Sequence, residues 1–422
     1  MRAILTLVAC AGIVASGCGG KDRTAAPVRT TSCSDVYYEG EGAPDAIIVS
    51  DLPREGGPGK ATATLMVDAI KFTLRRRGFR AGEHRIGYQA CNDTAGEEPF
   101  DQGLCERNAK AYADTPHVVG MIGPWNSGCA YVQIPILSRE DAGPLAMVSP
   151  SNTYVGLTRD GPGANPGDPG KLYSGVRNYA RVVPHDFAQA TALVSYAKTR
   201  GMKRAVTIAD ERDPYGSSIS GSFIEEARTR GLSVTEFDWR PRESYTGLAR
   251  RTARKRPELV YMAGLPQFNA KRLVEDLRAE LGDHVEIAGS DAFLDPDVAE
   301  GLGSAGEGLL VTSSGYPQDE LPAAGKAFLT AFGKPGYAFA SGYGAPEAAQ
   351  AAEVLLDAIA RSNGTRASIV EALFETRVKD GILGSFGFDS NGDVVPATGT
   401  VYRTHDGRAV VDRVVRVSPS GE

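Results

Sequence analysis

The sequence predicts an α/β protein made of two Rossmann-like lobes, each built on a parallel sheet. A chain of 422 residues with 42% hydrophobic residues can bury a large core, and it does so more readily as two lobes than as one. Short apolar runs alternate with amphipathic segments, which is the βαβ order of a parallel sheet. The Gly- and Pro-rich segment 161–170 separates two such series and is predicted to be an exposed loop.

The first series begins with AIIVSD at Ala46–Asp51, a short β-branched run typical of a buried parallel strand. The helix that follows carries apolar residues at helical spacing and ends at Gly78, which can adopt the left-handed conformation of a C-terminal cap. The remaining elements are predicted as strands at 85–90, 118–122 and 145–149, with helices at 104–113 and beyond Ser127.

The second series follows the loop in the same alternating order. Its predicted helices are 187–200, 219–230, 246–255 and 269–281, and its predicted strands are 204–209, 234–238, 259–262 and 285–288. The chain then becomes strongly helical over 321–360 and closes with a strand-like segment at 384–389 before an SNGD turn. We therefore expect a second α/β lobe.

The N-terminus has the features of an export signal. Arg2, an apolar run over 3–14 and small residues before Cys18 form a segment too short to span a bilayer stably. Ala15–Cys18 resembles a bacterial lipobox, so residues 1–17 would be a lipoprotein signal peptide and the mature chain would begin at a lipidated Cys18; an ordinary cleaved secretory signal is the alternative. Either signal places the protein outside the cytoplasm, and a lipid would anchor it to the cell membrane. Residues 18–44 are predicted to form a linker and an N-terminal arm.

The cysteines predict two disulfides. Once Cys10 and Cys18 are set aside, an even number remains in an oxidising compartment: Cys33, Cys91, Cys105 and Cys129. Four cysteines allow three connectivities. We predict the Cys91–Cys105 pair, because it closes a short local loop, and this leaves Cys33–Cys129 to hold the N-terminal arm.

Composition and motifs favour a protein that binds without catalysis. The formal net charge of −6 gives no reason to expect a nucleic-acid partner, and no later segment is apolar enough to cross a membrane. The five histidines are scattered, and HExxH, CxxC and GxSxG motifs do not occur. GLGSAG at 301–306 follows a predicted helix, the reverse of a dinucleotide site, and DSNGD at 389–393 fits a turn better than a calcium loop. We expect no enzymatic activity, no cofactor and no metal.

Several collinear segments resemble one known family. GMIGPWNSGCA, LAMVSPSNTYVGLT, VRNYARVVPHDFAQATAL, IADERDPYGSSI, IAGSDAF, SGYGAPEAAQAAEVLLDAI and GSFGFDSNGD occur in the order in which that family carries them. The region from about Ile47 to Arg413 is similar to type I periplasmic binding proteins of the Leu/Ile/Val-receptor family, the solute receptors of branched-chain amino-acid ABC importers. The resemblance implies three crossovers that form a hinge, with lobe 1 at 45–181 and 313–380 and lobe 2 at 182–312 and 381–417.

The resemblance also implies a ligand cleft between the lobes, and the residues of lobe 1 fit such a site. Ser127 follows a strand and opens a helix, so its hydroxyl and the nearby N–H groups could hold a carboxylate; a simple helix cap is the alternative. Ser149, Asn152 and Thr153 supply donors after the next strand, and Thr153 matches the family's hydroxyl ligand. These side chains could instead bond the backbone of their own turn. Trp125 is expected either to form a wall of the pocket or to pack in the core.

Three residues of lobe 2 complete the expected site. Tyr215 matches the family's tyrosine that closes over the ligand, and Asp291 stands where the family presents an acid to the ligand's ammonium group. Asp291 could alternatively cap the helix that begins near Asp295. Gln267 replaces a tyrosine that is frequent in the family, which argues against a leucine, isoleucine or valine ligand.

These observations lead to one functional hypothesis and one alternative. We expect a monomeric, lipid-anchored receptor that binds an amino acid or a similar small polar solute, closes by hinge bending and docks on a membrane ABC permease. The alternative is a ligand sensor that signals to a membrane partner without transport.

Overall fold

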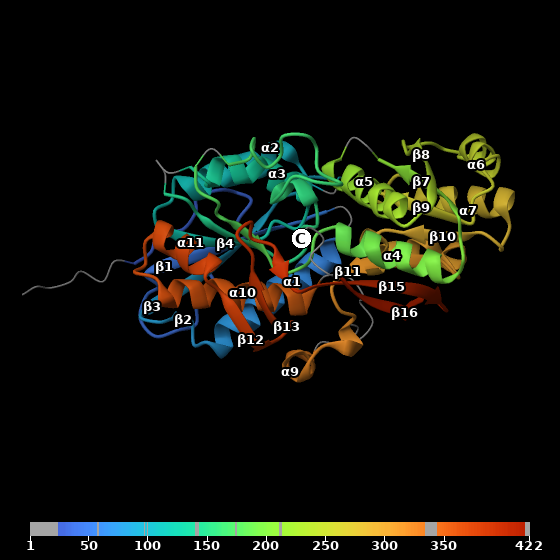
Figure 1. Ribbon diagram of the computed structural model, residues 1–422. Helices are drawn as coiled ribbons and strands as arrows, with labels where there is room; N and C mark the ends of the chain where they lie inside the picture. Colours follow the sequence, from blue (N-terminus) through green and yellow to red (C-terminus); the bar gives the residue numbers. More distant parts are fainter. Residues whose placement is uncertain are drawn as a thin grey trace, which may run out of the picture.

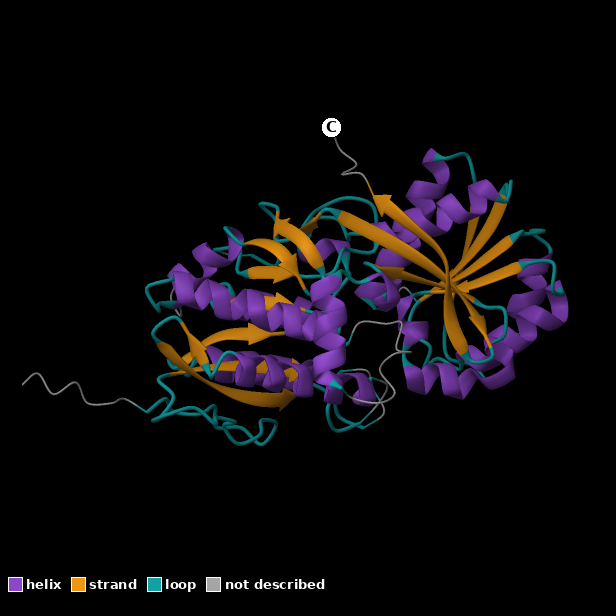
Figure 2. Cartoon of the chain, turned by 90° about the horizontal axis from the view of Figure 1, so that it is seen from below, coloured by secondary structure: helices purple, strands orange, loops and turns teal. Residues whose placement is uncertain are grey.

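The computed structural model consists of two α/β lobes that lie side by side (Figure 1). It describes residues 24–417 except 57–58, 97, 99, 140–142, 174, 211–212 and 334–343. The signal segment 1–17 and Cys18 therefore lie outside the described residues. In each lobe helices cover a central sheet, and Figure 2 shows the strands of the second sheet fanning out from a common centre. The predicted fold class, α/β with two parallel-sheet lobes, is confirmed.

The first lobe is built on a six-stranded sheet in the order β2-β3-β1-β4-β5-β6. Strands β3, β1, β4, β5 and β6 are parallel, and the short β2 pairs antiparallel with β3 at one edge. The strands are β1 (Ala46–Leu52), β2 (Arg80–Ala81), β3 (His84–Asn92), β4 (Val118–Ile122), β5 (Ala146–Ser149) and β6 (Tyr179–Arg181). All residues of β1 and β4 are buried, as their unbroken apolar runs predict.

Helices cover both faces of this first sheet. On one face lie α2 and α3, and on the other α1 packs against α10. The bounds are α1 (Lys60–Arg76), α2 (Gln102–Ala113), α3 (Ser127–Leu137), α9 (Ala323–Phe332), α10 (Ala345–Arg361) and α11 (Arg366–Phe374). Helix α1 ends as predicted, because Gly78 follows its last turn with φ +59°.

The second lobe is built on a seven-stranded sheet in the order β16-β15-β11-β10-β9-β7-β8. Strands β7 to β11 are parallel, and the hairpin β15–β16 adds two antiparallel strands at one edge. The strands are β7 (Arg204–Ala209), β8 (Ser233–Asp238), β9 (Leu259–Ala263), β10 (Glu286–Gly289), β11 (Leu310–Ser314), β15 (Ala397–His405) and β16 (Arg408–Val417). The helices are α4 (Phe187–Thr199), α5 (Pro214–Thr229), α6 (Thr246–Ala253), α7 (Ala270–Leu281) and α8 (Pro296–Leu302).

The chain passes between the lobes three times, and the third crossover differs from the prediction. The first crossover follows β6 at Arg181, as expected, and the second follows β11, which extends to Ser314. A three-stranded antiparallel sheet, β12 (Arg377–Gly381), β13 (Gly384–Phe388) and β14 (Val394–Val395), precedes the third crossover. Phe386, Phe388 and Val394 belong to the core of the first lobe, so residues 381–395 lie with lobe 1 and not with lobe 2.

The disulfides pair Cys33 with Cys91 and Cys105 with Cys129, so the predicted pairs Cys91–Cys105 and Cys33–Cys129 are wrong. The N-terminal arm forms an antiparallel bridge beside β3, and this places Cys33 against Cys91. Helices α2 and α3 pack on each other, and this brings the Cα atoms of Cys105 and Cys129 to 5.6 Å. Tertiary packing, and not loop length, decides which thiols meet in this protein.

The Gly- and Pro-rich segment 161–170 is a loop, as predicted, but it is not exposed throughout. Asp168 is fully buried, and its carboxylate accepts hydrogen bonds from the hydroxyls of Tyr131 (3.1 Å) and Tyr154 (2.8 Å). These two bonds hold the loop against α3 and against the segment that follows β5 in the first lobe.

Candidate functional site

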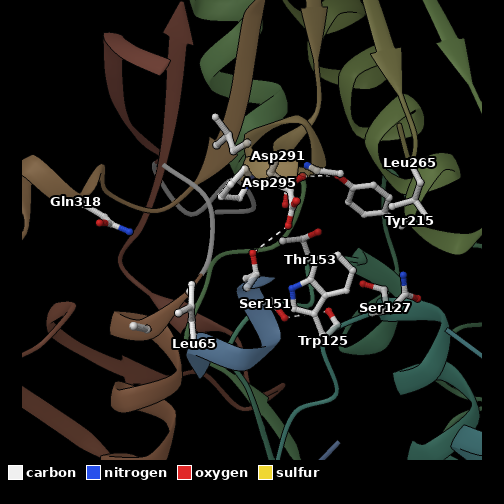
Figure 3. A pocket seen from close by; sticks show the side chains of 17 residues that line it. Leu65, Trp125, Ser127, Ser151, Thr153, Tyr215, Leu265, Asp291, Asp295 and Gln318 are labelled. Carbon is white, nitrogen blue, oxygen red and sulfur yellow. Dashed lines mark hydrogen bonds between the residues drawn. The ribbon is translucent and has the colours of Figure 1, made fainter. Parts of the chain in front are cut away.

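The candidate site is a pocket between the two lobes. It encloses about 60 Å³, which is room for a few water molecules or for one small solute. Figure 3 shows Trp125 and Ser127 on one side of it and Asp291 and Asp295 on the other. The described residues that line it include five predicted ones, Trp125, Ser127, Thr153, Tyr215 and Asp291, together with Thr62, Leu65, Asn126, Ser151, Leu265, Ala292, Leu294, Asp295, Pro296, Gln318, Gly344 and Ala345.

The N-terminus of α3 forms one side of the pocket. Asn126 is the cap residue, because its side-chain oxygen accepts a 2.7 Å hydrogen bond from the Gly128 N–H. The alternative in which Ser127 caps the helix is therefore wrong. Ser127 is the first residue of the helix, and its Oγ accepts a 3.3 Å bond from the Tyr154 N–H. The positive end of the helix and the Ser127 hydroxyl together favour a negatively charged group at this position.

The loop after β5 contributes Ser151 and Thr153 to the pocket, whereas Ser149 and Asn152 support it from behind. The Ser149 Oγ accepts bonds from the backbone N–H groups of Ser151 (3.2 Å) and Asn152 (3.0 Å). The Asn152 amide donates to the Trp125 carbonyl at 2.8 Å and accepts from the Tyr179 hydroxyl. Ser149 and Asn152 are not among the described lining residues, because their polar atoms hold two loops together, and their contact with a ligand stays a prediction.

Tyr215 and Asp291 form the opposite side of the pocket. Tyr215 lies in the first turn of α5, and its hydroxyl donates to the Asp291 carboxylate. The Gln189 side chain of α4 donates to the same carboxylate at 2.9 Å. Asp291 starts a 3₁₀ turn, and α8 is capped by Asp295, so the capping alternative for Asp291 does not apply. Asp291 remains 9% exposed, which leaves its carboxylate at the pocket surface.

A second carboxylate lies behind Asp291 and strengthens the negative character of this side. Asp186 is fully buried and accepts a 3.0 Å bond from the Gln189 amide that also binds Asp291. Burial, and next the negative charge of Asp291, raise the pKa of Asp186 to about 7. A cation bound against Asp291 would relieve this repulsion, so the pair favours a positively charged group in the pocket.

Hydrogen bonds between described residues join the lobes across the cleft, and one of them is donated by the Ser222 hydroxyl of α5 to the Pro162 carbonyl at 3.3 Å. The Thr62 hydroxyl of α1 donates to the Asp295 carboxylate at 2.9 Å, and the Val155 N–H donates to the Ser218 Oγ of α5 at 3.2 Å. Burial raises the pKa of Asp295, although the Thr62 bond opposes this shift. These bonds exist only while the lobes are close together, so the structure represents a closed arrangement.

Trp125 forms an apolar wall of the pocket, and Gln267 lies beside it in an adjoining small cavity. Gly59 touches the indole so closely that an added Cβ would lie 3.0 Å from the ring, and its φ of +89° also favours glycine. Among the described residues, neither polar atom of the Gln267 side chain has a hydrogen-bond partner. Gln267 does not line the main pocket. It lines the adjoining cavity, which shares Trp125 and Leu265 with the main pocket.

The site combines acids on one side with hydroxyls and a helix N-terminus on the other. Within the described part of the lining, Asp291 and Asp295 carry charge and no Lys, Arg or His is present. Such a pocket fits a solute that carries a positive group, or a zwitterion whose carboxylate lies toward α3. Sequence reasoning missed Thr62, Ser151, Asp295 and Gln189; the polar Gln189 on an otherwise apolar face of a predicted helix was the signal that could have identified the last of these.

A family profile described as "Periplasmic binding protein" matches residues 100–408. The chain belongs to the periplasmic binding protein family. Its members bind solutes and are not enzymes, which agrees with the sequence expectation. No curated protein sequence matches the chain. In the described residues, no helix is long and apolar enough to cross a membrane.

Solved structures confirm the type I periplasmic binding protein fold. The leucine-binding protein LivK from Thermotoga maritima is 23% identical and superposes with a TM-score of 0.73, covering 88% of this chain and 98% of LivK. LivJ from Streptococcus pneumoniae, in complex with isoleucine, is 18% identical, with a TM-score of 0.71 and coverage of 89% and 100%. A solute-binding protein from R. palustris in complex with benzoate is 17% identical, with a TM-score of 0.71 and coverage of 89% and 98%.

Proposed function

We propose that this binding protein is the receptor of an ABC importer and that it takes an α-amino acid or a similar small zwitterion into the cleft. The position of Asp291 opposite the N-terminus of α3 carries the proposal, because the two ends of a zwitterion need a negative and a positive partner. The leucine and isoleucine receptors of the same fold support the class of solute. Gln267 beside the pocket argues for a side chain other than a branched aliphatic one.

Thermal unfolding against a panel of amino acids, amides, polyamines and small carboxylates tests this proposal. A ligand of the folded state raises the unfolding midpoint in a dose-dependent way. We expect one α-amino acid to do so and Asp291→Ala to weaken its binding by about 2 kcal/mol, since the ammonium group would lose its counter-charge. Asp297→Ala is the matched control, because this exposed acid lies on α8 outside the pocket lining. Unchanged affinity in Asp291→Ala would mean that the pocket or the class of solute is wrong.

We also propose that a lipid on Cys18 anchors the protein at the outer face of the membrane. The sequence before Cys18 supports this attachment, and the linker that follows gives the lobes room to reach a permease. Cys18→Ser should move the protein from the membrane fraction to the soluble fraction. If the variant stays with the membrane, Cys18 is not the anchor.

A further inference from the structure

A second cavity of about 250 Å³ lies at the hinge and shares no described lining residue with the cleft pocket. All three crossovers contribute to its wall. They do so through Val182, Val183 and Pro184, through Ser314, Gly315 and Tyr316, and through Val394, Pro396 and Thr398. The cavity is therefore placed where the chain must bend when the lobes move relative to each other.

The wall of this hinge cavity is mostly apolar and partly aromatic. Leu321 and Phe386 line it and are 2% and 7% exposed, whereas Tyr316 is 39% exposed and lies at the surface. Tyr316 and Phe386 both line the cavity, so an aromatic guest would meet aromatic side chains in its wall. The cavity is large enough, and apolar enough, for a compact organic molecule.

One buried acid lines this mostly apolar wall. Glu347 of α10 is 7% exposed, and its carboxylate accepts a 2.8 Å hydrogen bond from the Gly344 N–H. No ion pair between described residues includes Glu347, and burial raises its pKa to about 7. The capping bond to Gly344 needs only an oxygen acceptor, which glutamine would also supply. The helix cap therefore does not explain why the buried residue is an acid.

We propose that the hinge cavity binds a small organic ammonium compound with an aromatic body, whose charge lies against the Glu347 carboxylate. Glu320, which also lines the cavity, adds a second negative charge at its exposed side, and no Lys, Arg or His occurs in the described lining. An ammonium group would supply the counter-charge that Glu347 lacks, and the apolar body would fill the space between the crossovers.

Occupancy of this cavity should depend on the position of the lobes. Because three separate crossovers form its wall, opening the cleft changes their mutual arrangement and hence the affinity for a guest. By linkage, the guest changes the affinity of the cleft for its own ligand by the same factor. The hinge cavity is thus a second, regulatory binding site that is separate from solute recognition.

Calorimetric titration with 2-phenylethylamine at pH 7.5 tests this site, with 2-phenylethanol as the uncharged analogue. We expect the amine to bind the protein and the alcohol to bind at least tenfold more weakly, since only the amine pairs with Glu347. Glu347→Gln keeps the acceptor for Gly344 but removes the charge, so it should weaken amine binding at least tenfold. Glu353→Gln, on the same helix but outside the cavity, should leave binding unchanged.

The variant Asp291→Asn distinguishes this site from the cleft. The amine could in principle lie against Asp291, so the proposal requires that Asp291→Asn retain amine binding while Glu347→Gln loses it. Loss in Asp291→Asn with retention in Glu347→Gln would assign the amine to the cleft and overturn the hinge site. Absence of heat and of any thermal shift with the wild-type protein would overturn it as well, without bearing on amino-acid binding in the cleft.

Discussion

The Thr62 hydroxyl donates a 2.9 Å hydrogen bond to the Asp295 carboxylate from the opposite lobe. Thr62 lies in the first turn of α1, and Asp295 caps α8 by accepting from the Asp297 N–H. Both side chains are buried and both line the cleft pocket. One bond thus connects the geometry of the pocket with the closed position of the lobes.

Replacing Thr62 by valine should shift the protein toward the open form. The change keeps the shape of the side chain and removes one hydrogen bond to a buried carboxylate, which costs about 1 kcal/mol. We expect the cleft ligand to bind roughly fivefold more weakly and the radius of gyration of the unliganded protein, measured by small-angle X-ray scattering, to increase. Thr64→Val is the control, because Thr64 is exposed and its hydroxyl donates to the Lys60 carbonyl of its own helix. Equal scattering of wild type and Thr62→Val would mean that this bond does not hold the lobes closed.

The sequence predicted most helices and strands because each carries its own periodicity. Strand β4 and strand β7 have the predicted bounds, and α2 and α4 differ by at most two residues. The hairpin β15–β16 was missed, although its turn at Asp406 and Gly407, both with positive φ, is a typical hairpin signal. The third crossover was misplaced because β13 packs on a core that is remote in sequence, and no local pattern encodes that choice.

Part of the pocket lining was predicted from the sequence, and the residues that were missed or misplaced have a physical explanation. Ser127, Thr153, Tyr215 and Asp291 follow strands or open helices, so the topology alone brings them to the cleft. Asn152 follows the same rule, but the Trp125 carbonyl and Tyr179 satisfy its side chain. Contacts across the cleft, such as the bond between Thr62 and Asp295, depend on how the lobes meet, and a pattern read along the chain does not contain that information.

The ion pair of Arg181 and Asp393 should be a major contributor to stability. Both side chains are buried, their charged groups are 2.7 Å apart, and Asp393 also binds Arg159 at 2.6 Å. Burial opposes ionisation, but Arg181, His185 and Arg159 hold the pKa of Asp393 well below its usual range. Asp393→Asn would leave the Arg181 charge buried without its partner and should lower the free energy of unfolding by about 3–5 kcal/mol in urea titrations.

The pH dependence of this pair follows from the lowered pKa. Its contribution to stability is present above about pH 4, the ordinary aspartate value, and is lost as the pH falls further. Glu106→Gln, which removes an exposed pair with Lys110, is the control and should not change stability measurably. If Asp393→Asn were as stable as the wild type, the ion pair of Arg181 and Asp393 would not be a major contributor to stability.

Buried acids in the first lobe should make the protein less stable as the pH rises from about 4 to 7. Burial raises the pKa of Asp51 to about 7, and burial together with the charge of Asp51 raises that of Asp93. The folded protein then binds more protons than the unfolded chain in this range, so the free energy of unfolding falls with pH. Asp93→Asn should reduce the difference in stability between pH 5 and pH 7.5, because an uncharged amide replaces the acid. The carboxylate oxygens of Asp93 have no hydrogen-bond partner among the described residues, so the change breaks no hydrogen bond between this side chain and those residues.

Urea unfolding at the two pH values measures this difference. The exposed Asp160→Asn serves as the control and should show the same change in the free energy of unfolding between the two pH values as the wild type. If Asp93→Asn shows the same pH dependence of the free energy of unfolding as the wild type, Asp93 does not take up a proton on folding.

The disulfide between Cys105 and Cys129 should stabilise the region that presents Ser127. It joins α2 to α3 two residues after Ser127 and closes a loop with a sequence separation of 24. A loop of this length corresponds to about 3 kcal/mol in the chain-entropy description, so replacing both cysteines by alanine should lower the free energy of unfolding by roughly that amount. Replacing Cys33 and Cys91 instead should loosen the N-terminal arm and leave the start of α3 in place, because that disulfide joins the arm to β3.

Non-reducing peptide mapping decides between the pairings directly: fragments linking Cys33 to Cys91 and Cys105 to Cys129 are expected, and a Cys91–Cys105 fragment would contradict the structure.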